Sequence, residues 1–151
     1  MKKITTLLFV FIAILNMNNS AFSQANSVGL NGSFVYNSIA AAYAAIGVVG
    51  SPQLVELSSA YTGANEVAPV SLTLKAGVSA LNTITIRPAA GANSLTLTKA
   101  SASSIFRFDS CSYVILDGRP GGITSSTANY FNVSNTTASG TSNAAIMVGA
   151  T

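Results

Sequence analysis

The residues able to carry out acid–base, nucleophilic or metal chemistry are few in this chain of 151 residues. It has no His, a single Cys (Cys111) and four acidic residues, Glu56, Glu66, Asp109 and Asp117. A His-dependent triad, a His-rich metal site and an intrachain disulfide therefore lack their residues, and Cys111 is expected to be a small buried hydrophobe rather than a reactive thiol. The spacing of the acidic residues nominates no carboxylate pair of the kind a glycosidase needs. We predict no catalytic, metal or cofactor site.

One segment, residues 117–122, has residue types that could bind a ligand. Asp117 could bind a cation, and the planar guanidinium of Arg119 could hold a carboxylated sugar. The same Asp-Gly-Arg-Pro-Gly-Gly sequence is typical of a tight turn in which the Asp accepts hydrogen bonds from nearby backbone N–H groups. The turn is the favoured interpretation, with Asp117 and Arg119 as candidate ligand residues. Strand stacking would also bring Arg87 close to Asp117 as a surface ion pair, worth about 0–1 kcal/mol.

The first 23 residues have the pattern of a secretory signal peptide. A pair of lysines precedes an apolar run over residues 4–15, and the chain then turns polar. A membrane span needs about 20 apolar residues, which is longer than this run. We expect cleavage after Ser23, which makes Gln24 the new N-terminus, with cleavage after Ala25 as the alternative. The protein is therefore predicted to pass through the periplasm and to be secreted or displayed at the cell surface, without a membrane span.

The charge balance gives no reason to expect a nucleic-acid partner or an anionic membrane. The formal net charge is +3, but two of the seven basic residues leave with the signal peptide, so five remain against four acidic ones. A net charge of +1 does not provide the basic surface that phosphate groups attract. The remaining chain is rich in Ser, Thr and Asn, whose side chains could hydrogen-bond to sugar hydroxyls without strong charge.

Eight short segments alternate apolar and polar residues, which is typical of β-strands with one face in a core. The clearest examples are the pairs Ile84/Ile86 and Leu95/Leu97, which have Thr on the opposite face. Small and polar residues separate the segments. The predicted strands are residues 54–57, 70–74, 83–86, 94–98, 104–108, 113–116, 130–133 and 144–148.

Residues 37–47 have helical rather than strand periodicity. Apolar residues recur at i, i+4 and i+7 from Ile39. Asn37 or Ser38 can supply the N-cap oxygen, and Gly47 can take the left-handed position after the last turn. We predict a short amphipathic helix that covers the open end of the first strands.

The spacing of the inward residues favours a repeating architecture. Val55, Ile84, Val114 and Ile146 are 29, 30 and 32 residues apart. A period of this length suits one coil of a β-solenoid, in which the coils stack and pair their strands in parallel. A β-sandwich with strands about ten residues apart is the alternative. The predicted apolar ladders are Val55/Ile84/Val114/Ile146 and Leu57/Ile86/Leu116/Val148.

Three segments carry a resemblance to known proteins: Leu54-Val-Glu-Leu-Ser-Ser-Ala-Tyr-Thr62, Thr83-Ile-Thr-Ile-Arg-Pro-Ala-Ala-Gly-Ala92 and Tyr113-Val-Ile-Leu-Asp-Gly-Arg-Pro-Gly-Gly122. The first segment, together with the predicted helix before it, is similar to the N-terminal cap and first coil of right-handed parallel β-helix proteins of the pectin-lyase-like superfamily. The other two segments resemble parts of large secreted surface proteins of Bacteroidetes, which implies further coils, adhesive modules and export by type IX secretion. The resemblance covers most of residues 33–148.

The sequence thus predicts an all-β right-handed parallel β-helix with a short N-terminal capping helix, whose cap and first three to four coils occupy residues 24–151. The chain stops as a predicted strand ends, so we expect the β-helix to be incomplete at the C-terminus. The predicted function is an exported structural, adhesive or glycan-binding scaffold without catalysis in this segment. Its expected partners are extracellular glycans or further domains of the same polypeptide. The alternative is the N-terminal part of a polysaccharide lyase or hydrolase whose catalytic coils lie beyond Thr151.

Overall fold

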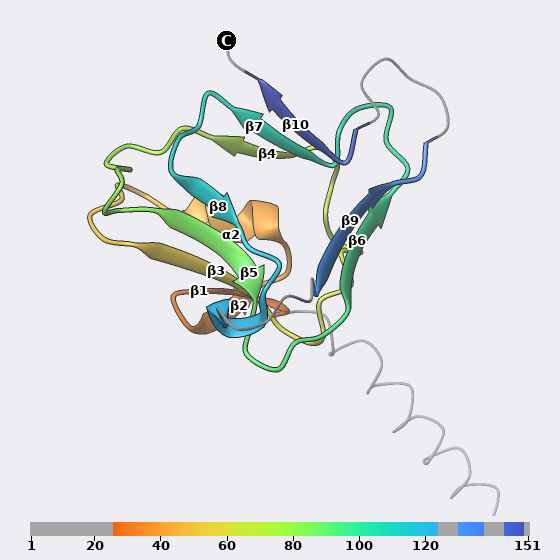
Figure 1. The fold of residues 1–151 in the computed structure, drawn as a ribbon, viewed down its shortest axis with the longest axis horizontal. Coiled ribbons are helices and arrows are strands. Elements are labelled where there is room, and N and C mark those ends of the chain that lie inside the picture. Colours follow the sequence, from red (N-terminus) through yellow and green to blue (C-terminus); the bar gives the residue numbers. More distant parts are fainter. Residues whose placement is uncertain (1–25, 124–129, 138–143, 150–151) are drawn as a thin grey trace, which may run out of the picture.

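The computed structural model describes residues 26–123, 130–137 and 144–149. The predicted signal peptide, with its cleavage site at Ser23 and Gln24, lies outside these ranges. Within these ranges, short strands form three small sheets, and one α-helix packs beside them (Figure 1). The elements are β1 (Val28–Leu30), β2 (Ser33–Tyr36), α2 (Ile39–Ala45), β3 (Gln53–Leu57), β4 (Val70–Thr73), β5 (Ile84–Pro88), β6 (Leu95–Lys99), β7 (Phe106–Asp109), β8 (Val114–Leu116), the 3-10 turn η1 (Pro120–Gly122), β9 (Phe131–Asn135) and β10 (Ile146–Gly149).

The three sheets surround a shared apolar core. Sheet A has the strand order β2-β1-β3-β5-β8, sheet B has the order β10-β7-β4, and sheet C consists of β6 and β9. The strand β1 pairs antiparallel with β2 and β3, whereas all the other pairs are parallel. In Figure 1 the helix α2 lies behind β5 and β8. It packs against the strands β1 to β4 and so covers one end of the core.

The prediction of a right-handed parallel β-helix is wrong for this structure. The sheets are small, the largest mixes antiparallel with parallel pairing, and none of them forms a solenoid. The physical reason is that the period near 30 residues holds only for β3, β5 and β8. In sheet C the step from Leu95 to Phe131 is 36 residues, and in sheet B the step from Phe106 to Ile146 is 40. The spacing of one sheet therefore does not extend to the others.

The two predicted apolar ladders, one from Val55 to Ile146 and one from Leu57 to Val148, are wrong at their first and last members. Val55 lies beside Ile86, which in turn lies beside Leu116, so the pairing of β3 with β5 is shifted by two residues from the prediction. Ile146 lies outside this sheet and pairs with Phe106 in sheet B. A shift of two residues keeps every side chain on the same face of a strand, so alternation cannot distinguish the two registers.

The eight predicted strands are confirmed, each within two residues of its predicted ends. The strands β1 and β2 were not predicted. They form a hairpin whose two turn residues, Asn31 and Gly32, both have positive φ (50° and 87°). This is the geometry of a type I′ turn, for which Asn-Gly is a preferred sequence. The Asn-Gly dipeptide between Leu30 and Ser33 was therefore an available signal for the missing hairpin.

The predicted helix is confirmed as α2. Its N-cap is Ser38, whose hydroxyl oxygen accepts a hydrogen bond from the Ala41 backbone N–H at 3.1 Å. The helix buries Ile39, Ala42 and Tyr43. The prediction that Gly47 takes a left-handed conformation is wrong, because Gly47 is not among the glycines with positive φ and the C-cap residue before it, Ile46, already has extended backbone.

Candidate functional site

The two candidate ligand residues, Asp117 and Arg119, bind each other. The guanidinium Nε of Arg119 lies 2.8 Å from Oδ1 of Asp117, and its Nη2 lies 2.9 Å from Oδ2. The backbone N–H of Arg119 also donates to Oδ1 at 3.0 Å, as the turn interpretation predicted. This hydrogen bonding holds the pKa of Asp117 below its ordinary value. A cation or a carboxylated sugar would therefore compete with this pair for the carboxylate of Asp117 or the guanidinium of Arg119.

Arg87 pairs with Glu56, so the predicted Arg87–Asp117 ion pair is wrong. Its Nε and Nη2 lie 3.2 and 3.0 Å from Oε1 of Glu56. The register of β3 and β5 sets these two residues side by side. The Asp117 backbone N–H donates to the Ile86 carbonyl at 2.9 Å, which places Asp117 on the other side of Arg87. The charge of Arg87 therefore still contributes to the low pKa of Asp117, without a direct contact.

Glu56, Arg87, Asp117 and Arg119 thus form a row of alternating charges at the carboxyl ends of β3, β5 and β8, called the charge row below. The turn η1 packs onto it at Gly122, where φ is +71° and an added Cβ would lie 2.4 Å from Nη1 of Arg87. The backbone angle favours glycine, and a larger residue would also displace the end of the Arg87 side chain. Through this contact between Arg87 and Gly122, the charge row holds the turn η1 against sheet A, which is a structural role.

The carboxyl group of Glu66 is buried, with 4% of the residue exposed. Its Oε1 accepts hydrogen bonds from the Ile39 backbone N–H and, at 3.1 Å, from the Tyr61 hydroxyl. Its Oε2 accepts from the Ala40 N–H at 3.4 Å. Glu66 thereby satisfies N–H groups at the start of α2 that have no partner within the helix. Burial outweighs these hydrogen bonds and raises the pKa of Glu66.

Sequence reasoning gave Glu66 no role. It lies 27 residues from Ile39 along the chain, and no local pattern links the two positions. The available signal was compositional, because an acidic residue among apolar strands has to be either exposed or partnered.

The other charged side chains of the described residues also have intramolecular partners. The guanidinium of Arg107 donates from Nε to both carboxylate oxygens of Asp109, at 2.8 and 2.7 Å. Lys75 donates to the Ile46 carbonyl at 2.9 Å, and Lys99 donates to the Ala64 carbonyl at 3.0 Å. Within the part of the chain that the structure describes, no group of three His, Cys, Asp or Glu residues is arranged to hold a metal ion.

Cys111 is half-buried and packs against the core, so it is less enclosed than the sequence predicted. Burial, together with the nearby charge of Asp109, raises the pKa of its thiol. Because the thiolate is the reactive form, we expect Cys111 to react with a thiol reagent such as DTNB several times more slowly at neutral pH in the folded chain than in urea. Equal rates in the two conditions would contradict this.

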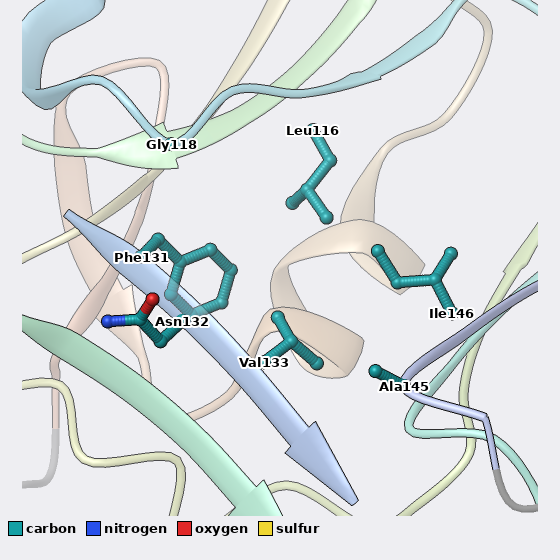
Figure 2. A pocket seen from close by; sticks show the side chains of 7 residues that line it. All are labelled: Leu116, Gly118, Phe131, Asn132, Val133, Ala145 and Ile146. Atoms are coloured by element: carbon teal, nitrogen blue, oxygen red, sulfur yellow. The ribbon is translucent and has the colours of Figure 1, made fainter. Parts of the chain in front are cut away.

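A hollow of about 360 Å³ opens between the ends of the three sheets (Figure 2). Apolar side chains from β8, β9 and β10 point toward it, with α2 visible behind them. The lining residues are Leu116, Gly118, Phe131, Asn132, Val133, Ala145 and Ile146.

The outer face of sheet C is polar and uncharged. Thr96 and Thr98 on β6 lie beside Asn132 and Ser134 on β9, respectively, and all four residues are exposed. These four residues are called the polar face below. Each side chain is both a hydrogen-bond donor and an acceptor, as sugar hydroxyls are.

Comparisons of the chain with protein-family models, curated proteins and solved structures find no match. The Bacteroidetes resemblance therefore depends only on the quoted segments, and type IX export stays a prediction. Among the described residues, no helix is long and apolar enough to cross a membrane.

Proposed function

We propose that the chain is an exported, noncatalytic scaffold that binds neutral extracellular glycans through the polar face. One contrast carries this proposal. The charged side chains of the described residues are engaged within the chain, whereas the polar face directs four uncharged hydrogen-bonding side chains to solvent. The export step follows from the predicted signal peptide.

The engagement of the carboxylates supports the noncatalytic part of the proposal. A glycosidase requires one carboxyl group as an acid and a second as a base or nucleophile. All four acidic residues of the chain have structural partners, either an arginine or the backbone of α2. Recruiting any one of them for catalysis would break its contact with that partner.

The geometry of the polar face supports the glycan part. Neighbouring strands lie about 4.8 Å apart, and successive outward residues on one strand lie about 7 Å apart, so the four side chains form a compact grid. Their backbones are fixed by the parallel pairing of β6 and β9, so little conformational freedom is lost on binding. The ammonium group of Lys99, at the end of β6, is bound to the Ala64 carbonyl. We therefore expect neutral sugars to bind better than uronates.

The test is binding of the purified chain to immobilised neutral polysaccharides (glucan, mannan and xylan) and to polygalacturonate. We expect binding to at least one neutral polysaccharide, and expect Thr96→Val/Thr98→Val to weaken it about tenfold. Valine keeps the branched shape of threonine, while two hydrogen bonds worth about 0.5–1.5 kcal/mol each are lost.

The matched control is Ser71→Val/Thr73→Val, which changes two exposed hydroxyl residues on β4 in sheet B. Its binding should equal that of the wild type. Binding to polygalacturonate alone, or an equal loss in both double variants, would contradict the proposed site.

A further inference from the structure

The turn between β1 and β2 contains the dipeptide that is most susceptible to deamidation. Asn31-Gly32 is the only Asn-Gly in the chain, and every other Asn is followed by a residue with a side chain. A backbone nitrogen can attack the side-chain carbonyl of an Asn that precedes it, and glycine favours this attack because no Cβ crowds the nitrogen. Both residues are exposed, and a Cβ added to Gly32 would meet nothing within 4 Å. Solvent therefore reaches the dipeptide.

The reaction passes through a cyclic imide. The Gly32 nitrogen forms a bond to Cγ of Asn31 and gives up its proton, while the bond from Cγ to Nδ2 breaks and ammonia leaves. Water then opens the ring at one of its two carbonyl groups. The product is aspartate or, where the main chain now continues through Cγ, isoaspartate. Water is the only co-reactant, so the chemistry needs no enzyme, metal or oxidant.

The fold binds the Asn31 side chain to β3. Its Oδ1 accepts a hydrogen bond from the Leu54 backbone N–H at 2.9 Å, and its Nδ2 donates to Oε1 of Gln53 at 2.8 Å. The Asn31 backbone N–H also donates to the Leu54 carbonyl at 2.8 Å. The residue thereby continues the pairing of β1 with β3 beyond Leu30 (Figure 1). Ring closure would take the side-chain amide away from both of its partners.

The left-handed backbone of Asn31, with φ at 50°, also opposes ring closure. In this conformation Cβ lies close to the carbonyl oxygen of its own residue, and it therefore points away from the nitrogen of the next residue. The imide ring requires the opposite arrangement, with Cβ and the Gly32 nitrogen on the same side of the Cα–C bond. The turn therefore has to open before the ring can form.

We propose that Asn31 is a deamidation site that its contacts with β3 protect for as long as the β1–β2 hairpin is folded. Deamidation then follows the opening of the hairpin and is irreversible. The isoaspartate product adds a backbone carbon to a two-residue turn, whose length sets the register of β1 and β2. This product prevents the hairpin from closing again in its original register. The site is independent of glycan binding, because the polar face lies on sheet C and the hairpin belongs to sheet A.

The test is the rate of Asn31 deamidation in the purified chain at mildly alkaline pH, in buffer and in guanidinium chloride. Mass spectrometry of peptides detects the loss of the amide, and chromatography separates aspartate from isoaspartate. We expect the folded chain to react at least about tenfold more slowly, because two side-chain hydrogen bonds and the turn have to be broken first. Equal rates in the two conditions, or an unmodified Asn31 in guanidinium chloride, would overturn the proposal.

The variant Gln53→Met tests the contact with β3 directly. It removes the acceptor for Nδ2 of Asn31 and keeps the length of the side chain, so deamidation of the folded chain should become about two- to fivefold faster. The matched control is Ser51→Ala, which removes a hydroxyl 3.3 Å from Nε2 of Gln53 and leaves the Asn31 contact in place. Its rate should equal that of the wild type. Circular dichroism spectra that overlay would show that both variants fold, and equal rates in the two variants would contradict the proposed protection.

Discussion

Replacing Glu66 with alanine is expected to lower the free energy of unfolding by about 2–5 kcal/mol. The substitution leaves the buried Ile39 N–H and the Tyr61 hydroxyl without an acceptor, and each unsatisfied buried donor costs about 1–3 kcal/mol. It also removes the acceptor for Ala40 at the start of a helix of only seven residues. The measurement is urea unfolding at neutral pH. A loss below about 1 kcal/mol would show that these groups find other partners.

The matched control for this site is Glu66→Gln. The glutamine carbonyl can still accept from Ile39 and Tyr61, so the loss should be clearly smaller than for alanine. The two variants together separate the hydrogen bonds from the charge. Equal losses would contradict the assignment of the acceptor role to this side chain.

Comparing the wild type with Glu66→Gln also predicts how the free energy of unfolding changes with pH. Because the pKa of Glu66 is raised in the folded chain, folding favours the protonated carboxyl group. Its contribution to stability is complete below the unfolded-state pKa and is lost as the pH rises through the folded-state pKa. We therefore expect the stability of the wild type, relative to Glu66→Gln, to fall as the pH rises from acidic values toward neutrality. A difference that is constant or rises with pH would contradict the direction of the shift.

Replacing Phe106 with alanine is expected to cost about 3–5 kcal/mol, the usual range for a fully buried phenylalanine. The ring of Phe106 contacts that of Phe131 edge to face, with centroids 6.4 Å apart, and Phe131 meets Tyr61 in the same way at 6.1 Å. This aromatic chain joins β7 of sheet B to β9 of sheet C. Its loss would therefore remove packing between two sheets that share no backbone hydrogen bond among the described residues.

Phe108→Ala provides the matched control, since Phe108 lies on the same face of the same strand and is only half-buried. Its loss should be about 1–3 kcal/mol, in proportion to the smaller area that folding removes from water. Both values come from urea unfolding under identical conditions. Equal losses for the two phenylalanines would contradict the difference in their burial.

Local features of the fold could be predicted from the sequence. Alternation located eight strands, because an apolar face is needed at every second residue of a half-buried strand. The helical spacing from Ile39 and the Ser38 cap located α2. The sequence also indicated that Asp117 serves a turn, because Asp-Gly followed by Pro120 has few other uses.

The features that could not be predicted depend on pairing between distant segments. A shift of two residues moves Val55 from Ile84 to Ile86 without changing any face, so the partner of Arg87 was misassigned. A regular period in one sheet was extended to strands that follow other spacings, which produced the wrong architecture. The role of Glu66 required knowing that the loop before β4 returns to α2.

The central claim is that the charged side chains have structural roles within the chain, whereas the uncharged polar face binds the glycan. The most direct measurement is a titration of the isotope-labelled chain with neutral glucan, mannan and xylan oligosaccharides, followed by backbone amide NMR. We predict shifts centred on Thr96, Thr98, Asn132 and Ser134, with the charge row unchanged. Shifts centred on Asp117 and Arg119, or no shift with any of the three sugars, would contradict that claim.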